Sequence, residues 1–410
     1  MNHDQMTSDA RRSHLMLLGG QSHGELAMAA DVMGMVAGYL TAESLPDLCR
    51  AQAGRAGGQP CRGYVVSDSW EGMADQLARR RDRWTTVSGQ LRPIVMVFPG
   101  YEVPHRQMLA NLSQIDSGMG RFVEACDRAA RHVGLTGLLD DDDNEPNRHV
   151  RSLAAQICFA DAWIRAGLRP DAMVGHSLGE YAAAVMARVM SLPDAFRLVQ
   201  ARAIALREMS SRYRMLSVDA EQTVVDEILA RDDLEACPAA YNAPGLTTVS
   251  APVSKCAELS ALVAERGGSV TPIAVSGAGH RPEFAPRLGE FVRIAAATPL
   301  HQPVCRVVST VCPDRDPGQL ADPRHWLRQA CQPVRFADAL ARCPARGYVS
   351  AGFTPGIISV VQRNPADASL GGRVLVPSIQ SGRSYRRQFL RAVGQAFEHG
   401  VEVDINCLEE

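Results

Sequence analysis

The sequence predicts an α/β fold with a parallel sheet, a smaller sheet inserted into it and a further small α/β unit ahead of both. The apolar segment "RPIVMVFPGYE" at 92–102 ends in a Pro-Gly turn, as a strand buried in a parallel sheet does. Residues 169–189 read as strand, tight turn and Ala-rich helix. Between 212 and 275, strand-like and helical segments alternate, which is typical of a small sheet with two helices.

The small unit in front occupies residues 14–88. Apolar runs predict strands at 14–20 and 61–68, and helical spacing predicts helices at 24–40 and 69–84. This order of strand, helix, strand and helix indicates a compact α/β module.

The remaining elements flank the central strands. Helical spacing covers 118–134 and 150–167. The acidic run at 139–147 between them is interpreted as a solvated loop, because its like charges lack the turn-positioned oxygens of a metal site. Further strands are predicted at 304–310 and 345–352, each preceded by a helix.

These segments divide the chain into four parts. We expect an N-terminal unit at 1–90, a large subdomain, a small ferredoxin-like subdomain at 212–275 and a tail at 371–410 that packs back on the others. The large subdomain is expected in two pieces, 91–211 and 276–370, because the small one interrupts it.

Composition describes an ordinary globular protein. The 410 residues are 46% hydrophobic and 21% charged, with a net charge of -2, so neither disorder nor a general attraction to nucleic acid is indicated. The 11 cysteines form no Cys-x-x-Cys pair and no His cluster has ligand spacing, which argues against a bound metal or a disulfide framework. No apolar run is long enough for a signal peptide or a membrane span, so a cytoplasmic location is expected.

The stretch "MVGHSLGEYAA" places Ser177 between Gly175 and Gly179. A Gly-x-Ser-x-Gly turn between strand and helix is the arrangement that exposes a nucleophilic serine. The helix dipole and the backbone N–H of Leu178 would stabilise a developing oxyanion there. Glycines that merely pack helix against strand are the alternative interpretation of the motif.

Wider context favours the nucleophile. "GHSLGE", with "FPG" ending a strand about 75 residues upstream, resembles the acyltransferase family that loads acyl carrier proteins in fatty acid and polyketide synthesis. The resemblance implies an α/β-hydrolase-like large subdomain and a second oxyanion donor, the backbone N–H of Tyr101. It also implies that no permanent cofactor is bound and that the substrates are an acyl-CoA donor and the phosphopantetheine arm of the carrier.

Further segments extend the resemblance and imply substrate-binding residues. Arg202 in "VQARAIAL" lies where the family has an arginine that binds the free carboxylate of a malonyl-type group, a geometrically matched pair. A surface ion pair is the alternative interpretation of Arg202. The other residues implied to bind substrate are His176, Gln156, Asn242 and Gly279.

The same comparison implies a base for the serine. "AVSGAGHRPEF" resembles the segment that delivers the family's catalytic histidine, here His280. A backbone carbonyl orients that ring in the family, and "CQPVRFADAL" assigns the role to the main-chain oxygen of Arg335.

The two ends of the chain resemble parts of modular polyketide synthases. Residues 14–88 are similar to the adaptor that links ketosynthase to acyltransferase, and "GVEVDINCL" is similar to the tail that follows such acyltransferases. The resemblance implies an acyl carrier protein as partner and a ketosynthase or synthase module as a further one. The chain is expected to work as a separate protein or as a piece of a larger one.

Some positions depart from the family pattern. The usual "FPGQGSQ" is "FPGYEVP" here, so Tyr101 and Glu102 make the entrance bulkier and more polar, and "SAGFTPGII" at 350–358 lacks the usual acid. Gly279 before the histidine frees space for an α-substituent, whereas Leu178 favours malonyl.

We therefore expect a malonyl or α-substituted malonyl group to pass from a thioester through an acyl-serine to a carrier thiol. The alternatives are a proofreading hydrolase of carrier-bound acyl groups, a transferase between two carriers and, least favoured, a non-catalytic docking module. A general esterase is disfavoured because its acid and histidine follow in another arrangement.

Overall fold

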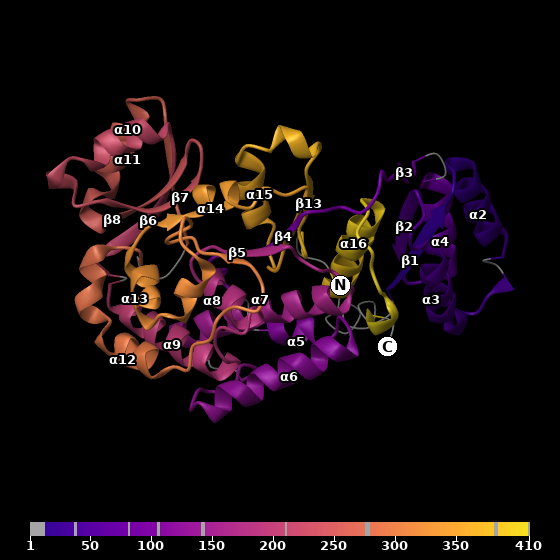
Figure 1. Ribbon diagram of the computed structural model, residues 1–410, viewed down its shortest axis with the longest axis horizontal. Helices are drawn as coiled ribbons and strands as arrows, with labels where there is room; N and C mark the ends of the chain where they lie inside the picture. Colours follow the sequence, from indigo (N-terminus) through magenta and orange to yellow (C-terminus); the bar gives the residue numbers. More distant parts are fainter. Residues whose placement is uncertain are drawn as a thin grey trace.

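The computed structural model describes residues 13–36, 39–80, 83–104, 107–140, 144–209, 211–274, 279–380 and 384–408. Within these residues the strands form three sheets, of which the central one is parallel (Figure 1). The predicted α/β fold with a parallel sheet is confirmed.

The central sheet has the strand order β10-β5-β4-β12-β13, and every neighbouring pair is parallel. Its strands are β4 (Ile94–Phe98), β5 (Ala172–Gly175), β10 (Val307–Val308), β12 (Gly347–Ser350) and β13 (Val374–Val376). All of β4 is buried: Ile94, Met96 and Phe98 enter one hydrophobic core, and Val95 and Val97 enter a second core on the opposite face. Burial on both faces is the reason that this strand is a continuous apolar run.

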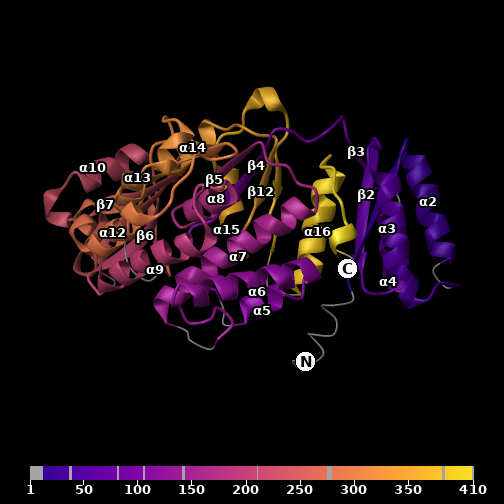
Figure 2. The same cartoon turned by 60° about the horizontal axis from the view of Figure 1, so that its bottom comes forward.

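Helices cover both faces of the central sheet. The larger layer consists of α5 (Met108–Leu112), α6 (Ser117–His132), α7 (Glu145–Arg165), α8 (Gly179–Met186), α9 (Leu192–Met209), α12 (Gly289–Ala297) and α13 (Pro323–Cys331). The opposite face is covered by α14 (Phe336–Ala341) and α15 (Gly356–Arg363) (Figures 1 and 2). The sheet therefore lies between two apolar layers, as predicted for a parallel sheet.

The small subdomain has its own five-stranded sheet, with the order β11-β7-β8-β6-β9. Its elements are β6 (Tyr213–Asp219), α10 (Gln222–Leu229), β7 (Cys237–Ala243), β8 (Leu246–Pro252), α11 (Cys256–Ala264), β9 (Ser269–Pro272) and the later strand β11 (Val334–Arg335). Strand β11 pairs in parallel with β7 and comes from outside residues 212–275. It therefore ties the small sheet to the chain that follows α13.

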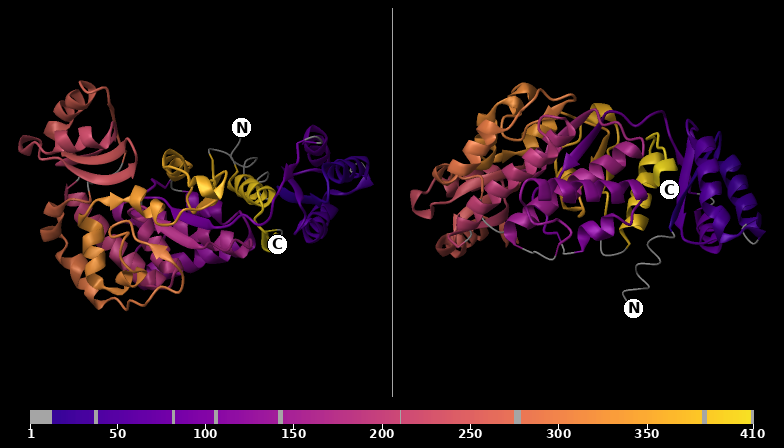
Figure 3. Two further views of the ribbon diagram at one scale, coloured as in Figure 1. Left: turned by 45° about the horizontal axis from the view of Figure 1, so that its top comes forward. Right: turned by 90° about the horizontal axis from the view of Figure 1, so that it is seen from below.

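The N-terminal unit is an antiparallel sheet in the order β1-β2-β3. Its elements are β1 (His14–Gly20), α2 (His23–Val36), α3 (Leu45–Ala56), β2 (Cys61–Ser67), α4 (Trp70–Arg80) and β3 (Thr85–Thr86). Helix α3 was not predicted, because its sequence "LPDLCRAQAGRA" is mostly polar or small, although Pro46 in its first turn is a helix-start signal. The unit and the small subdomain lie at opposite ends of the molecule (Figure 3).

The C-terminal helix α16 (Tyr385–Glu398) lies between the central domain and the N-terminal sheet (Figure 1). Close approach is possible because Gly394 lacks a side chain where the Tyr64 ring of β2 packs. Arg80 pairs with Glu398 at 2.9 Å, which fastens α4 to the same helix. One hydrophobic core consequently runs from the central sheet through α16 into the N-terminal unit.

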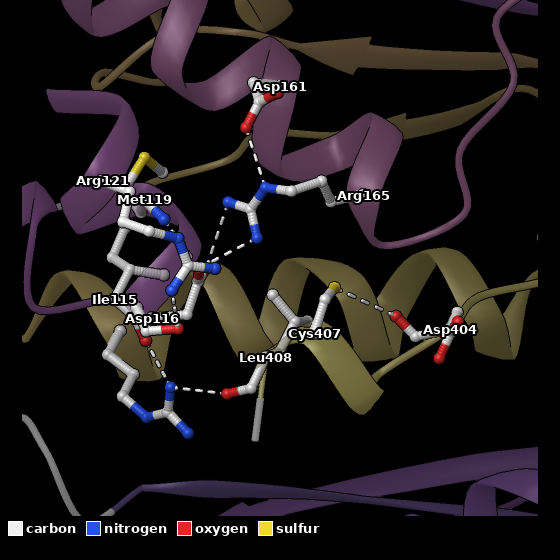
Figure 4. Close-up of polar contacts among 11 residues, drawn as sticks. Ile115, Asp116, Met119, Arg121, Asp161, Arg165, Asp404, Cys407 and Leu408 are labelled. Atoms are coloured by element: carbon white, nitrogen blue, oxygen red, sulfur yellow. Dashed lines mark hydrogen bonds and ion pairs between the residues drawn. The ribbon is translucent and has the colours of Figure 1, made fainter. Parts of the chain in front are cut away.

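A polar cluster holds the end of the chain against α6 and α7 (Figure 4). Arg165 donates to Asp116 at 2.9 Å and to Asp161 at 2.8 Å, while Asp116 caps α6. Arg386 of α16 donates to the carbonyls of Ser13 and Leu408, each at 2.8 Å.

None of the described helices is long and apolar enough to cross a bilayer.

Candidate active site

Ser177 occupies a sharp turn between the end of β5 and the start of α8. Its φ of 48° is in the left-handed region, which is unusual for a residue with a side chain. Both flanking glycines are required by space, since a Cβ on Gly175 would lie 2.2 Å from the Glu180 nitrogen and one on Gly179 would lie 2.4 Å from the Phe98 carbonyl. The turn is therefore a strained strand-to-helix elbow that the surrounding backbone holds in place.

The hydroxyl of Ser177 lies beside an imidazole. Ser177 Oγ is 2.7 Å from His280 Nε2, and Nδ1 of the same ring is 2.9 Å from the carbonyl oxygen of Gln332. Because a carbonyl can only accept, Nδ1 carries the proton and Nε2 is left to accept the serine proton. This arrangement is a nucleophile and its base, with a third group that orients the base.

The carbonyl that orients His280 belongs to Gln332, so the prediction of Arg335 for this role was wrong. Gln332 follows the last turn of α13, where carbonyls have no partner within the helix. Arg335 lies in β11, where it pairs with β7, and its own N–H donates to Thr310 at 2.6 Å. The offset of three positions arises because the sequence does not reveal where α13 ends and the chain turns toward the small sheet.

Burial and a neighbouring cation keep His280 neutral. The side chain is only 3% exposed, and burial, with the positive charge of Arg202 as the second cause, lowers the pKa of His280 to about 3. The imidazole is thus in its proton-accepting form at neutral pH.

Arg202 on α9 points at the nucleophile. Its Nη2 donates to Ser177 Oγ at 3.2 Å, and the residue is 3% exposed. Burial lowers the pKa of Arg202, and no carboxylate among the described residues forms an ion pair with it. A buried guanidinium without a counter-ion is costly, which indicates that an anionic ligand neutralises it.

The turn after β4 presents the backbone of Tyr101 beside the elbow. A Cβ on Gly100 would lie 3.0 Å from His176 Nδ1, so the two turns are in contact. The buried Gln156 of α7 donates to the Gly100 carbonyl at 3.1 Å. Because C=O and N–H of a trans peptide point in opposite directions, Gln156 holds the Tyr101 N–H pointing away from α7. The N–H of Leu178, at the N-terminus of α8, has no partner within that helix.

Helix α13 supports both members of the Ser–His pair. Gln329 Nε2 donates to the carbonyl of Ser177 at 2.7 Å, and the carbonyl of Ala330 accepts the backbone N–H of His280 at 2.9 Å. With Gln332, three contacts from one short segment fix the strained serine and the histidine relative to each other. These contacts have no motif in the sequence, because two come from main-chain carbonyls and the third comes from a single glutamine.

A buried polar network lies behind the elbow. Glu180 accepts from Thr310 at 3.0 Å and lies 3.0 Å from His325 Nε2, and all three side chains are fully buried. The Thr310 hydroxyl is also 3.0 Å from the carbonyl of Gly175. The network therefore joins α13 to both ends of the elbow. Glu180 lies in the Ala-rich helix α8, and a buried carboxylate requires hydrogen-bond partners. Its position in the sequence was therefore a signal that groups such as Thr310 and His325 would lie beside it.

The small subdomain reaches the elbow through Asn242. His176 Nε2 is 2.8 Å from Asn242 Oδ1, and Asn242 Nδ2 donates to Thr248 at 2.9 Å. This contact bridges the turn after β5 of the large subdomain and β7 of the small one. Of the predicted binding residues, His176 and Asn242 are therefore brought together, whereas Gln156 lies behind the Gly100 turn.

Gly279 lies beside Arg202. A Cβ at this position would lie 3.2 Å from Leu206 Cδ2 and 3.5 Å from Arg202 Nη2. Residues 275–278 of the quoted "AVSGAGH" segment lie outside the described residues. A side chain at this position would crowd Leu206, so the glycine allows the backbone before His280 to pack closely against α9.

Glu102 departs from the family pattern and fastens the turn after β4 to the segment at 350–358. Its carboxylate accepts from the Phe353 N–H at 3.0 Å and from the Thr354 hydroxyl. Burial raises the pKa of Glu102 to about 7, against the effect of these hydrogen bonds.

Comparison with known proteins agrees with this geometry. The family model described as "Acyl transferase domain" matches residues 122–403. A non-reducing polyketide synthase of Aspergillus ustus is 28% identical over 85% of this chain, and an erythronolide synthase of Saccharopolyspora erythraea is 30% identical over 84%. The chain spans only 18% and 10% of the lengths of these two relatives. The acyltransferase domain from module 8 of the salinomycin polyketide synthase superposes with a TM-score of 0.86 at 23% identity, covering 96% of this chain and 97% of the other.

Proposed function

The chain belongs to the acyl transferase domain family, and we propose that it moves a malonyl-type acyl group from a thioester, through an ester on Ser177, to the phosphopantetheine thiol of an acyl carrier protein. One observation carries this proposal. The hydroxyl of Ser177 lies 2.7 Å from a neutral imidazole and 3.2 Å from a buried guanidinium that has no carboxylate partner among the described residues. Nucleophile, base and anion-binding group thus converge on one oxygen atom.

In the first half-reaction, Ser177 Oγ attacks the thioester carbonyl and its proton passes to His280 Nε2. The oxyanion of the tetrahedral adduct accepts from the N–H groups of Tyr101 and Leu178. The C–S bond then breaks, the departing sulfur takes the proton from His280, and an acyl-serine ester remains.

The second half-reaction runs the same steps toward a new acceptor. The carrier thiol gives its proton to His280 Nε2 and its sulfur attacks the ester carbonyl. The C–O bond to Ser177 breaks, and the serine oxygen recovers the proton. The Nδ1 hydrogen bond to Gln332 stabilises the imidazolium that forms in both halves.

Arg202 defines the class of acyl group. Its planar guanidinium matches a carboxylate in a bidentate arrangement, and in a buried site the pairing is strong. A malonyl-type group has its free carboxylate a short distance from the carbonyl that Ser177 attacks. The donor is therefore proposed to be a malonyl or α-substituted malonyl thioester, with no permanently bound cofactor.

The N-terminal unit is proposed to be an adaptor toward a ketosynthase or a synthase module. Its sheet is covered by α2, α3 and α4 on one side and by α16 on the other, so it forms a continuous body with the catalytic part. A unit fixed in this way would set the distance between the Ser177 site and a neighbouring catalytic domain. The proposed setting of the reaction is the cytoplasm.

Mass spectrometry of the intact protein tests the proposal. Malonyl-CoA and methylmalonyl-CoA are expected to add their acyl mass to the wild type but not to Ser177→Ala, whereas acetyl-CoA adds little. Ser359→Ala, which alters an exposed serine of α15, is the matched control and should load like the wild type. Absence of any adduct with all donors would contradict the proposal.

Adding a carrier protein with its phosphopantetheine arm then identifies the acceptor. Transfer predicts that the acyl mass moves from the enzyme to the carrier. Release of free acid in the presence of the carrier would identify a hydrolase instead.

A further inference from the structure

Arg281, the residue that follows His280, reaches into the small subdomain. Its Nη1 donates to the carbonyl of Ser250 in β8 at 2.9 Å, and its Nη2 donates to the carbonyl of Glu235, shortly before β7, also at 2.9 Å. The guanidinium lies over the ring of Tyr213 in β6, 4.2 Å from the ring centroid. Three separate parts of the small subdomain thus form one socket around Arg281, which we define by Tyr213, Glu235 and Ser250.

The socket encloses a positive charge that no buried carboxylate neutralises among the described residues. Arg281 is 2% exposed, and its hydrogen-bond acceptors, two main-chain carbonyls and the Ser250 hydroxyl, are all neutral. Glu283 lies 3.3 Å from Nε, but its side chain is 59% exposed, so water weakens this ion pair. Because desolvation offsets most of the contact energy of a buried charge, the arginine adds little net stability. What its planar guanidinium supplies is a fixed direction toward two carbonyls.

His280 lies on the other side of the same peptide and is held in the large subdomain. Its φ of 60° is in the left-handed region, which is unfavourable for a residue with a side chain. Its backbone N–H donates to the carbonyl of Ala330 at 2.9 Å, and its ring lies between Gln332 and Ser177. Strain of this kind persists only where the surroundings over-determine the backbone. After His280, the first fixed group along the chain is the side chain of Arg281.

Resting on the proposed function, we propose that Arg281 is a positioning residue, through which the small subdomain sets the place of the His280 imidazole. Two consecutive side chains are fixed in different bodies, one against Ser177 and one in the socket. A shift of the small sheet therefore moves the backbone that carries the base. Arg202, which is proposed to bind the acyl carboxylate, lies on α9 outside the socket. Loss of the socket should consequently slow proton transfer and leave donor binding nearly unchanged.

The first test replaces the guanidinium by an apolar chain of similar length, Arg281→Met. The maximal rate at which Ser177 is loaded, measured by intact-protein mass with malonyl-CoA or methylmalonyl-CoA and divided by the folded fraction, should fall by about 10- to 100-fold with little change in KM. Arg281→Lys keeps the charge and a donor, so it should recover part of the rate. Arg287→Met alters an exposed arginine of the same short helix, Pro282–Arg287, and should load like the wild type.

The second test repeats Arg281→Met in a His280→Ala background. If Arg281 acts through the imidazole, the residual loading rate should change by less than about twofold there, because the two substitutions share one effect. Loss by the same factor in both backgrounds would identify a general structural role and overturn the proposal. A wild-type rate for Arg281→Met in the presence of His280 would also overturn it.

The half-buried Tyr213 gives a variant that leaves Arg281 in place and is informative even if Arg281→Met does not fold. Tyr213→Leu removes the aromatic face under the guanidinium and should lower the loading rate by about threefold, but only where His280 is present. Tyr213→Phe keeps the ring and is the matched control. Equal rates for the two variants would contradict the socket's role. Failure of the wild type to load from any donor would instead contradict the proposed function, so the two failures are distinguishable.

Discussion

The two sides of Ser177 differ in whether the groups that contact the serine and its base are paired within the protein. On the elbow side, the carbonyl of Ser177, the backbone N–H and Nδ1 of His280 and the carboxylate of Glu180 all have partners at 2.7–3.0 Å. On the other side, the buried guanidinium of Arg202 has no carboxylate partner among the described residues. The reacting atoms are thus held in advance, whereas the guanidinium proposed to bind the acyl carboxylate would be paired by the substrate.

The largest effect is expected on the elbow side. His280→Ala should lower the acylation rate by about 10³-fold, because general-base assistance of this kind contributes roughly 10² to 10⁴. The rate of adduct formation on Ser177 measures it, and the KM for the donor should change little. If the variant kept more than a tenth of the wild-type rate, His280 would not be the base that activates Ser177.

Arg202→Ala is the corresponding change on the other side of Ser177. We expect the ratio of kcat/KM for malonyl over acetyl donors to fall by about 100-fold, since removing one partner of a buried charge pair costs about 2–5 kcal/mol. Arg207→Ala, on the same helix but exposed, is the control. An unchanged ratio would mean that the unpaired guanidinium has another role.

Gln329→Ala removes one partner from the elbow and leaves a single backbone oxygen unpaired. The carbonyl of Ser177 would lose the hydrogen bond of 2.7 Å, which costs about 1–3 kcal/mol in a buried site. We expect kcat to fall about tenfold while KM stays nearly constant, since the residue acts on the position of the nucleophile. The rate should therefore be divided by the fraction of the protein that is folded. If the variant is less stable but its folded molecules react at the wild-type rate, Gln329 has a purely structural role.

The last prediction concerns the pH dependence of stability and not the rate of catalysis. The pKa values of His149, a buried residue of α7, and of His280 are about 3 in the folded protein, against about 6.5 in an unfolded chain, so the unfolded state binds more protons between these limits. The free energy of unfolding therefore declines as the pH falls below about 6.5, by roughly 1.4 kcal/mol per pH unit for each ring. His149→Phe should reduce this slope by one such contribution in urea titrations at several pH values. His132→Phe, at the exposed end of α6, should retain the wild-type slope, and identical slopes for all three proteins would contradict a neutral, buried His149.

Much of the architecture was accessible from local patterns. The apolar run of β4, the alternation that produces β6 to β9, and the glycines around Ser177 each depend on neighbours in sequence, and each lies where the pattern indicated. Helix α3 was missed because its residues are individually weak signals. The fifth strand of the small sheet was missed because two residues, Val334 and Arg335, are too short a run to detect.

The elbow follows from local sequence, because a side chain at Gly175 or Gly179 would collide with backbone. His280 and Arg202 were indicated by segments that resemble a known family. The groups that hold these residues could be identified only from the folded chain. Gln332 reaches His280 across 52 residues, His325 reaches Glu180 across 145, and Gln329 reaches Ser177 across 152. The physical reason is that a turn or a strand is set by local backbone sterics, whereas these partners meet only after α13 has packed against the elbow and its end has turned toward the small sheet.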